Sequence, residues 1–255
     1  MDGSANGKST LRLVIKNQTK KSVPSFYLLL IVILTTSLLI KTFQKIDSSN
    51  IILSGTNNFS KQDILIHSSL KLPERLIFIK TKLIERELLE KFSLKNISID
   101  RQLFPFGLKI SIQTRQPLAY AERKNDGIVN NGYTDIDGYF IPLEFAEIGK
   151  EKYTIKIIGW DKDFQNQISK ILKFYYQNDN NLESIKISQE GFIELREKKL
   201  NKIILGYRPN IIKIKKQLNI IKEMKIQLDD NEILKNLDIV NLTDPAYPEI
   251  KVFKP

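Results

Sequence analysis

The chain has 255 residues, with 40 Lys and Arg against 29 Asp and Glu, which gives a formal net charge of +11. Hydrophobic residues make up 42%, so the chain can bury real cores and is not a disordered polypeptide. It contains no cysteine, which excludes disulfides, cysteine-based zinc sites and thiol nucleophiles. The basic residues form no stripe with interleaved aromatics, so we do not expect nucleic acid as a partner.

The N-terminal segment is basic and is followed by an uncharged stretch. Residues 1–22 contain one acid, Asp2, against five cations: Lys8, Arg12, Lys16, Lys20 and Lys21. Residues 23–40 carry no charge and predict a helix that spans roughly 27 Å. A signal peptide is the alternative, but no small-residue cleavage site follows. We therefore expect an uncleaved transmembrane helix over residues 23–43, embedded in membrane lipid.

The positive flank also predicts the orientation of the chain. Basic residues beside a membrane helix favour the cytoplasmic side, so residues 1–22 are expected to form a cytoplasmic tail. The rest of the chain is then exported. The sequence thus predicts a single-pass protein of the cytoplasmic (inner) membrane whose C-terminal body lies in the periplasm.

The next segment predicts a β-α-α-β-β order. Residues 51–55 read as a strand that ends at a glycine, and Ser60 with Asp63 has the spacing of a helix capping box. Residues 81–92 carry apolar side chains every fourth position, as an amphipathic helix does. Two alternating strands follow, joined by a Pro-Phe-Gly turn, at residues 96–99 and 108–112.

The C-terminal half predicts a mostly antiparallel β region with two helices. Asp137-Gly138 is a strong hairpin signal, and we interpret Asp135 and Asp137 as turn residues, not as a metal or acid pair. The helices are expected at residues 164–176 and 209–228; the second is basic and could bind acidic lipid, but a core helix with a solvated face is the preferred interpretation. The expected strands are 153–160, 182–187, 192–196, 202–205, 237–242 and 247–253. The fold class predicted for the exported body is α+β.

No motif in the sequence predicts catalysis or a cofactor. His67 is the single histidine, and without cysteine it cannot make a typical zinc site, so a surface or capping role is expected. Phosphate-binding glycine loops and a nucleophile elbow are absent. Paired acids that meet only in space stay open as a possibility. We expect no cofactor, no metal and no small-molecule substrate.

Two short motifs carry a resemblance to a known family. The run Ile99-Asp100-Arg101-Gln102-Leu103-Phe104-Pro105 precedes a strand, and Arg115-Gln116-Pro117-Leu118-Ala119 follows the next one. Together with the β-α-α-β-β order they resemble the FtsQ/DivIB cell-division proteins, which consist of a polypeptide-transport-associated (POTRA) module and a β domain. The family usually has an acid where this chain has Thr114.

The resemblance implies a domain division and a function. It implies a POTRA-like domain over residues 48–117 and a β domain over residues 118–255, with Arg115 and Pro117 at the joint. It also implies a non-enzymatic scaffold at the division septum that recruits and regulates later division proteins, FtsB-like and FtsL-like. Two alternatives stay open: an exported wall-modifying enzyme on a signal anchor, and a POTRA-type chaperone subunit of a transport system.

The C-terminal strand is the candidate site for a partner. Pro248 lacks an N–H, so a strand over residues 246–253 is expected at a sheet edge, where another chain can pair with it. The alternative is a terminal strand whose edge is simply guarded by proline and lysine. We predict Tyr247 and Phe253 as apolar contacts and Glu249 and Lys251 as register-setting charges. The intervening Ile250 and Val252 are expected in the core.

Overall fold

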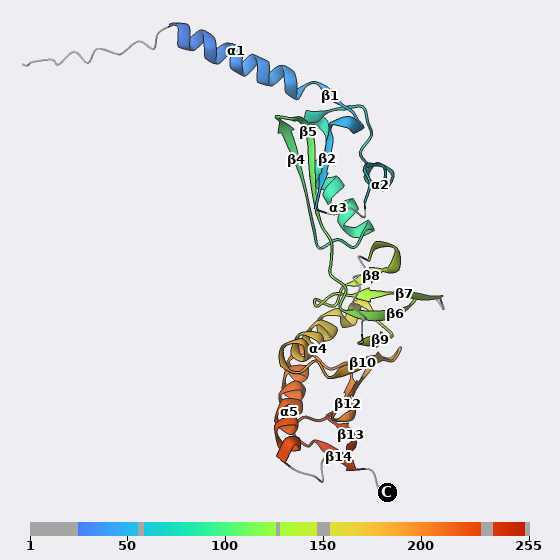
Figure 1. Ribbon diagram of the computed structural model, residues 1–255. Helices are drawn as coiled ribbons and strands as arrows, with labels where there is room; N and C mark the ends of the chain where they lie inside the picture. The colour runs from blue at the N-terminus through green and yellow to red at the C-terminus, as the bar shows by residue number, and fades with distance from the viewer. Residues whose placement is uncertain (1–24, 56–58, 126–127, 147–153, 231–236, 253–255) are drawn as a thin grey trace, which may run out of the picture.

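The computed structural model describes residues 25–55, 59–125, 128–146, 154–230 and 237–252. The predicted α+β composition is confirmed in this part of the chain. A helix, α1 (Ser25–Thr42), is followed by a three-stranded sheet and then by a nine-stranded sheet, called here the small and the large sheet (Figure 1). The expected cytoplasmic tail, residues 1–22, lies outside the described residues.

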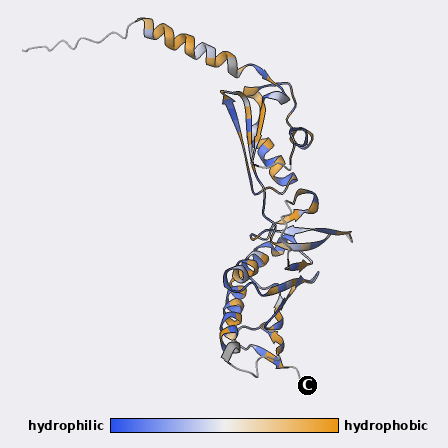
Figure 2. Ribbon diagram, in the orientation of Figure 1, coloured by the Kyte–Doolittle hydropathy of each residue, from blue (hydrophilic) through white to orange (hydrophobic). Residues whose placement is uncertain are grey.

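The predicted membrane-spanning helix over residues 23–43 is wrong, and the predicted inner-membrane localisation is corrected with it. In the described residues, no helix combines the length and the apolar character needed to cross a membrane. Helix α1 is apolar along most of its length (Figure 2). The 18 residues of α1 span roughly 27 Å at 1.5 Å per residue, against a hydrocarbon core of about 30 Å, and they include Lys41 and the hydroxyl residues Thr35, Thr36 and Ser37.

The small sheet has the order β2-β5-β4, with β5 in the middle. Strand β5 (Phe106–Gln113) pairs parallel with β2 (Ile51–Ser54) and antiparallel with β4 (Asn96–Leu103). The three predicted strands are thus confirmed; β4 and β5 extend beyond the alternating runs that predicted them, while β2 ends one residue before the predicted end at Gly55. On β4, Ile97 and Ile99 are buried, because every second side chain points to the same face.

Two helices cover this sheet on one face (Figure 1). Helix α2 (Lys61–Ile66) begins with the predicted capping box: the Ser60 N–H donates to Asp63, and the Asp63 N–H donates back to the Ser60 hydroxyl. These bonds from Ser60 hold the pKa of Asp63 below its usual value. Helix α3 (Thr81–Lys91) buries Ile84 and Leu88 against the sheet. A short ribbon pairs β1 (Lys45–Ile46) with β3 (Glu74–Arg75) beside them.

The large sheet is mostly antiparallel, as expected: of its eight neighbouring pairs, five are antiparallel. Its described strands, in spatial order, are β14 (Glu249–Val252), β13 (Leu237–Asn241), β12 (Asn201–Tyr207), β11 (Phe192–Glu197), β10 (Leu182–Ile187), β9 (Lys156–Ile158), β6 (Ala119–Asn125), β7 (Ile128–Thr134) and β8 (Phe140–Pro142).

The sequence did not predict β6 and β7 as strands. Their hairpin projects from the body (Figure 1), and beside its tip Ile128 and Val129 are 66% and 58% exposed, so this part of the hairpin shows no burial pattern. Its buried positions include Ala119 and Ala121, which are small and carry little β signal. The two strands pair with each other over seven positions, and β6 pairs further with β9 and β7 with β8.

Both predicted helices of this half are present, and each runs on further than expected. Helix α4 (Gln165–Asn178) buries Ile168, Ile171 and Tyr175. Helix α5 (Ile211–Asp230) buries Ile214 and Ile221 on the sheet side, while its lysines at 215, 216 and 222 are exposed. The predicted core helix with a solvated face is confirmed.

A buried ion cluster joins these helices to strand β11. The Nζ atom of Lys225 on α5 lies 2.8 Å from Asp179 Oδ2 and 3.1 Å from Glu197 Oε1. It also lies 4.5 Å from the centre of the Tyr175 ring. Burial raises the pKa of the Tyr175 hydroxyl, and the negative charges of Glu197 and Asp179 raise it further. Lys225 therefore supplies the positive charge that makes the burial of Glu197 tolerable.

Replacing that lysine tests the role of the cluster. Lys225→Ala leaves the Glu197 carboxylate buried without its cation, so we expect the free energy of unfolding to fall by about 3–5 kcal/mol. Urea denaturation measures it. Lys222→Ala, an exposed lysine one turn earlier, is the control and should change stability by less than about 0.5 kcal/mol. Equal effects of the two substitutions would contradict a structural role for Lys225.

Candidate functional site

Strand β14 forms one end of the large sheet and pairs with β13 alone among the described strands. Its four residues are all exposed, and Ile250 and Val252 are each 44% exposed. The prediction that these two residues belong to the core is wrong. A strand with a single neighbour has little to cover either face, so both sets of alternate side chains stay open to solvent.

The predicted contact residues lie along this edge. Tyr247 is 78% exposed in the turn just before β14, where its N–H donates to the carbonyl of Asp244. Glu249 accepts from the side-chain amide of Asn241 at 2.9 Å, across the pairing with β13. Lys251 lies opposite Ile239. Phe253, the fourth predicted residue, lies outside the described residues.

The proline occupies the position that the edge requires. Pro248 lies directly before β14 and leaves the strand's own residues with their backbone N–H groups. On the side away from β13, no described strand uses these groups. The edge therefore presents backbone donors and acceptors with exposed side chains on either face, the arrangement that an added strand completes.

A hollow of about 520 Å³ lies beside this edge, between α5 and the turn that leads into β14. Two lysines give it a positive border, and Ile212, which is 69% exposed, gives it an apolar wall. Its lining consists of Asn210, Ile212, Lys213, Lys216, Asn219, Ile220, Asp244, Pro245 and Ala246. The sequence did not predict this hollow, because the helix and the turn that form it are far apart in the chain.

The other predicted site, the domain joint, contains a buried ion pair. The connector, residues 114–118, links β5 to β6 and carries Arg115 and the half-buried Pro117. Arg115 Nη1 lies 2.7 Å from Asp135 Oδ2, with the two side chains 10% and 6% exposed. The guanidinium also stacks 3.6 Å from the centre of the Tyr139 ring. Sequence reasoning identified the arginine but missed its acid.

Asp135 is a turn residue, as predicted from the sequence, and it is also the acid that pairs with Arg115. Its Oδ1 atom accepts the backbone N–H groups of Asp137 and Tyr139, which closes the turn between β7 and β8. The Gly138 carbonyl in that turn accepts the indole N–H of Trp160 at 2.9 Å. The Asp137-Gly138 pair was the sequence signal for this turn. Nothing in the sequence indicated that Arg115 reaches it from twenty residues away.

A second hollow, of about 570 Å³, lies at this joint and brings the two acids together. Thr114, where the FtsQ/DivIB pattern has an acid, is part of its lining. Asp135 and Asp137 both face it, but each is bonded to a cation, Arg115 and Lys173. The Lys173 ammonium holds the pKa of Asp137 below its usual range. Asp137 is thus not the raised-pKa acid of a hydrolytic pair, and Asp135 is held by Arg115 and by the backbone of the turn.

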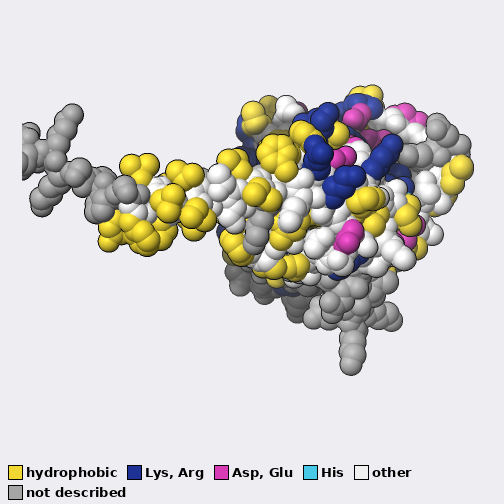
Figure 3. Space-filling model, turned by 90° about the horizontal axis from the view of Figure 1, so that it is seen from above, with side chains coloured by type: hydrophobic (Ala, Val, Ile, Leu, Met, Phe, Trp, Pro, Cys, Tyr) yellow, Lys and Arg dark blue, Asp and Glu magenta, His cyan; other side chains and the backbone are white. Residues whose placement is uncertain are grey.

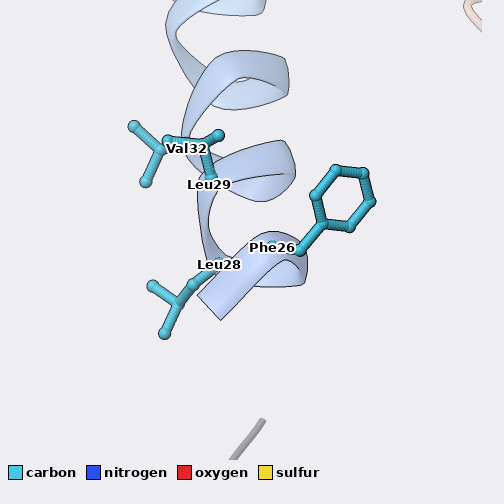
Figure 4. Close-up of a pocket in the computed structure, with 4 residues that line it drawn as sticks. All are labelled: Phe26, Leu28, Leu29 and Val32. Atoms are coloured by element: carbon cyan, nitrogen blue, oxygen red, sulfur yellow. The ribbon is translucent and has the colours of Figure 1, made fainter. Parts of the chain in front are cut away.

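The described residues provide little other chemistry. They contain no group of three or more side chains suited to holding a metal ion. His67 is the C-cap residue of α2 and meets the Phe92 ring edge-on at 5.3 Å, in line with the predicted capping role. A hollow along α1 is lined by Phe26, Leu28, Leu29 and Val32 alone, which have no group for acid–base work (Figure 4).

On the face seen in Figure 3, Lys and Arg side chains gather on the body among Asp and Glu, while most side chains of α1 are apolar. The two candidate surfaces described above are the β14 edge and the joint around Arg115. Both suit contacts with protein.

The architecture of the first sheet defines the class of domain. A β-α-α-β-β chain that places its last strand between the other two and covers one face with both helices is a POTRA fold. Residues 47–115 match the family model described as "POTRA domain, FtsQ-type". The chain therefore contains an FtsQ-type POTRA domain, and the resemblance to FtsQ/DivIB is confirmed for this segment. No curated protein matches the chain.

The family of the matched domain indicates a functional class. FtsQ-type POTRA domains indicate a cell-division family whose members are generally non-enzymatic and act through protein–protein contacts. The large sheet and its β14 edge lie outside the matched residues.

Proposed function

We propose that this protein is a non-enzymatic scaffold of the bacterial division machinery, which recruits and regulates later division proteins. The FtsQ-type POTRA domain at residues 47–115 is the observation that carries the proposal. FtsB-like and FtsL-like proteins are the proposed partners. Recruitment needs a surface that recognises a chain without transforming it, and the open β14 edge has that property.

The partner is proposed to add a strand to β14. Main-chain hydrogen bonds supply affinity in such pairing, and side chains on alternate positions supply selectivity. Tyr247 is the exposed aromatic anchor, while Lys251 offers a charge to an acid on the incoming strand. Glu249 is already bonded to Asn241, so its contribution is to fix the turn and strand that the partner meets.

Loss of the edge should abolish capture of the partner. Deleting residues 246–255 removes the strand while α4, α5 and the rest of the sheet keep their own contacts. We expect binding of a tagged FtsB-like segment to weaken at least about 100-fold, the scale of a lost hot spot. Isothermal titration measures it, and circular dichroism checks that the truncated protein is folded.

A single substitution tests the same edge without removing the strand, and it is not expected to unfold the protein. Tyr247→Ala changes a side chain that is 78% exposed, and we expect roughly 10-fold weaker binding from it. Tyr176→Ala is the matched control, since Tyr176 is 66% exposed on α4, away from the edge. Full binding by the folded truncation would place the interface elsewhere, and charge reversal at Lys213 and Lys216 would then test the hollow beside α5.

We propose further that the chain is built of two modules, residues 48–117 and 118–255. Two separate hydrophobic clusters support this division. The first is formed by residues between Ile46 and Ile112, with Phe145 as its single contributor from beyond the connector. Each cluster has its own sheet and its own helices, so each can exclude water by itself.

Isolating the first module tests this division. A fragment of residues 48–117 contains both helices and all three strands of the small sheet. We expect a folded circular-dichroism spectrum and a cooperative thermal transition. A fragment without cooperative unfolding would show that the two clusters form one inseparable domain.

A further inference from the structure

An aromatic side chain from one sheet packs on the core of the other. Phe145 lies in the short turn η3 (Leu143–Phe145), directly after β8 of the large sheet. Its ring centre is 5.2 Å from that of Phe92 and 6.1 Å from that of Phe59. Both of these rings belong to the core of the small sheet, where they are 2% and 6% exposed. Phe145 therefore crosses from one hydrophobic core to the other.

The segment that carries Phe145 is firmly held at its start. Phe140 is buried in the core of the large sheet, with its ring centre 5.2 Å from that of Trp160. Ile141 is 2% exposed, and Pro142 fixes the backbone at the entry to the turn. A few residues thus connect a side chain fixed in one core to a side chain seated in the other. Such a short, packed link transmits orientation, because it has little freedom to bend.

Besides Phe145, the joint between the two sheets consists of the connector with its ion pair and a hollow. The connector, residues 114–118, has no regular structure, and the Arg115–Asp135 pair ties it to the β7–β8 turn. The 570 Å³ hollow at the joint has Gly55, Lys95 and Gln113 of the small-sheet side on one wall. Interfaces of this kind allow two domains to move unless a specific contact prevents it. At this joint, Phe145 supplies an apolar contact that reaches from the segment after β8 to the core of the small sheet.

We propose that Phe145 is a latch that sets the orientation of the large sheet relative to the FtsQ-type POTRA domain. With the ring packed against Phe59 and Phe92, which are themselves in contact, the two parts move as one body. With the ring released, the chain hinges at residues 114–118 and the hollow at the joint changes its shape. The latch is independent of the proposed partner and of the β14 edge.

Distance measurements between two spin labels test the latch directly. The chain has no cysteine, so introduced cysteines are its sole labelling sites. Lys109→Cys on β5 and Lys186→Cys on β10 place one exposed label on each sheet. In the full chain we expect one narrow distribution of distances. Adding Phe145→Ala should broaden that distribution at least twofold, and an unchanged width would overturn the proposal.

A matched substitution separates the latch from the turn that carries it. Leu143 lies in the same turn but is 45% exposed, so Leu143→Ala should leave the distribution narrow. A second pair of labels, at Lys109→Cys and Glu90→Cys, reports on the small sheet and α3 alone. This internal distance should stay unchanged with Phe145→Ala. If it broadens as well, Phe145 is an ordinary core residue of the POTRA domain and the latch is refuted.

Discussion

The parallel pairing of β12 with β13 is the constraint on which the C-terminal part of the structure depends. Parallel neighbours cannot be joined by a tight turn, so the chain must cross the sheet and return, and α5 is the crossover. Its buried stripe, Ile214 through Ile221, lies on the sheet. Gln217 adds a specific bond at each strand, because its Nε2 atom donates to the carbonyls of Leu205 and Leu242 at 2.7 Å. Helix α5 therefore places β13 beside β12, and β13 in turn pairs with β14, the strand that forms the open edge.

The sequence predicted the small sheet better than the large one, for a physical reason. In the small sheet, signals are local: the Ser60–Asp63 capping box, the apolar stripe of α3 and the alternation of β4 all concern residues within one turn or one strand. In the large sheet, β6 and β7 pair with each other without an alternating apolar pattern, and the other neighbour of β6 is β9, which follows only after β7 and β8. Helix α1 shows a further limit, since an uncharged run in the sequence was read as a membrane span, and no described helix is both long and apolar enough to cross a membrane.

The candidate site was predictable in outline and not in detail. Pro248 indicated an edge strand, and β14 is one. Alternation suggested that Ile250 and Val252 face the core, but a pattern of side chains cannot show whether anything lies opposite them. Asp135 was read as a turn residue because its second bond, to Arg115, spans a distance in sequence that no spacing rule covers. The contacts that could not be predicted from the sequence are those between residues far apart in the chain.

Trp160 is the sole tryptophan of the chain and lies in the middle of these contacts. Its indole N–H is bonded to the Gly138 carbonyl, in the turn that Asp135 closes, and its ring packs on Phe140, where the segment leading to Phe145 begins. The side chain is 7% exposed, so its surroundings are protein and not solvent. The molecule consequently carries a native fluorophore at its joint. Its emission spectrum will report rearrangement there in the unlabelled protein, during unfolding or on addition of a partner that has no tryptophan of its own.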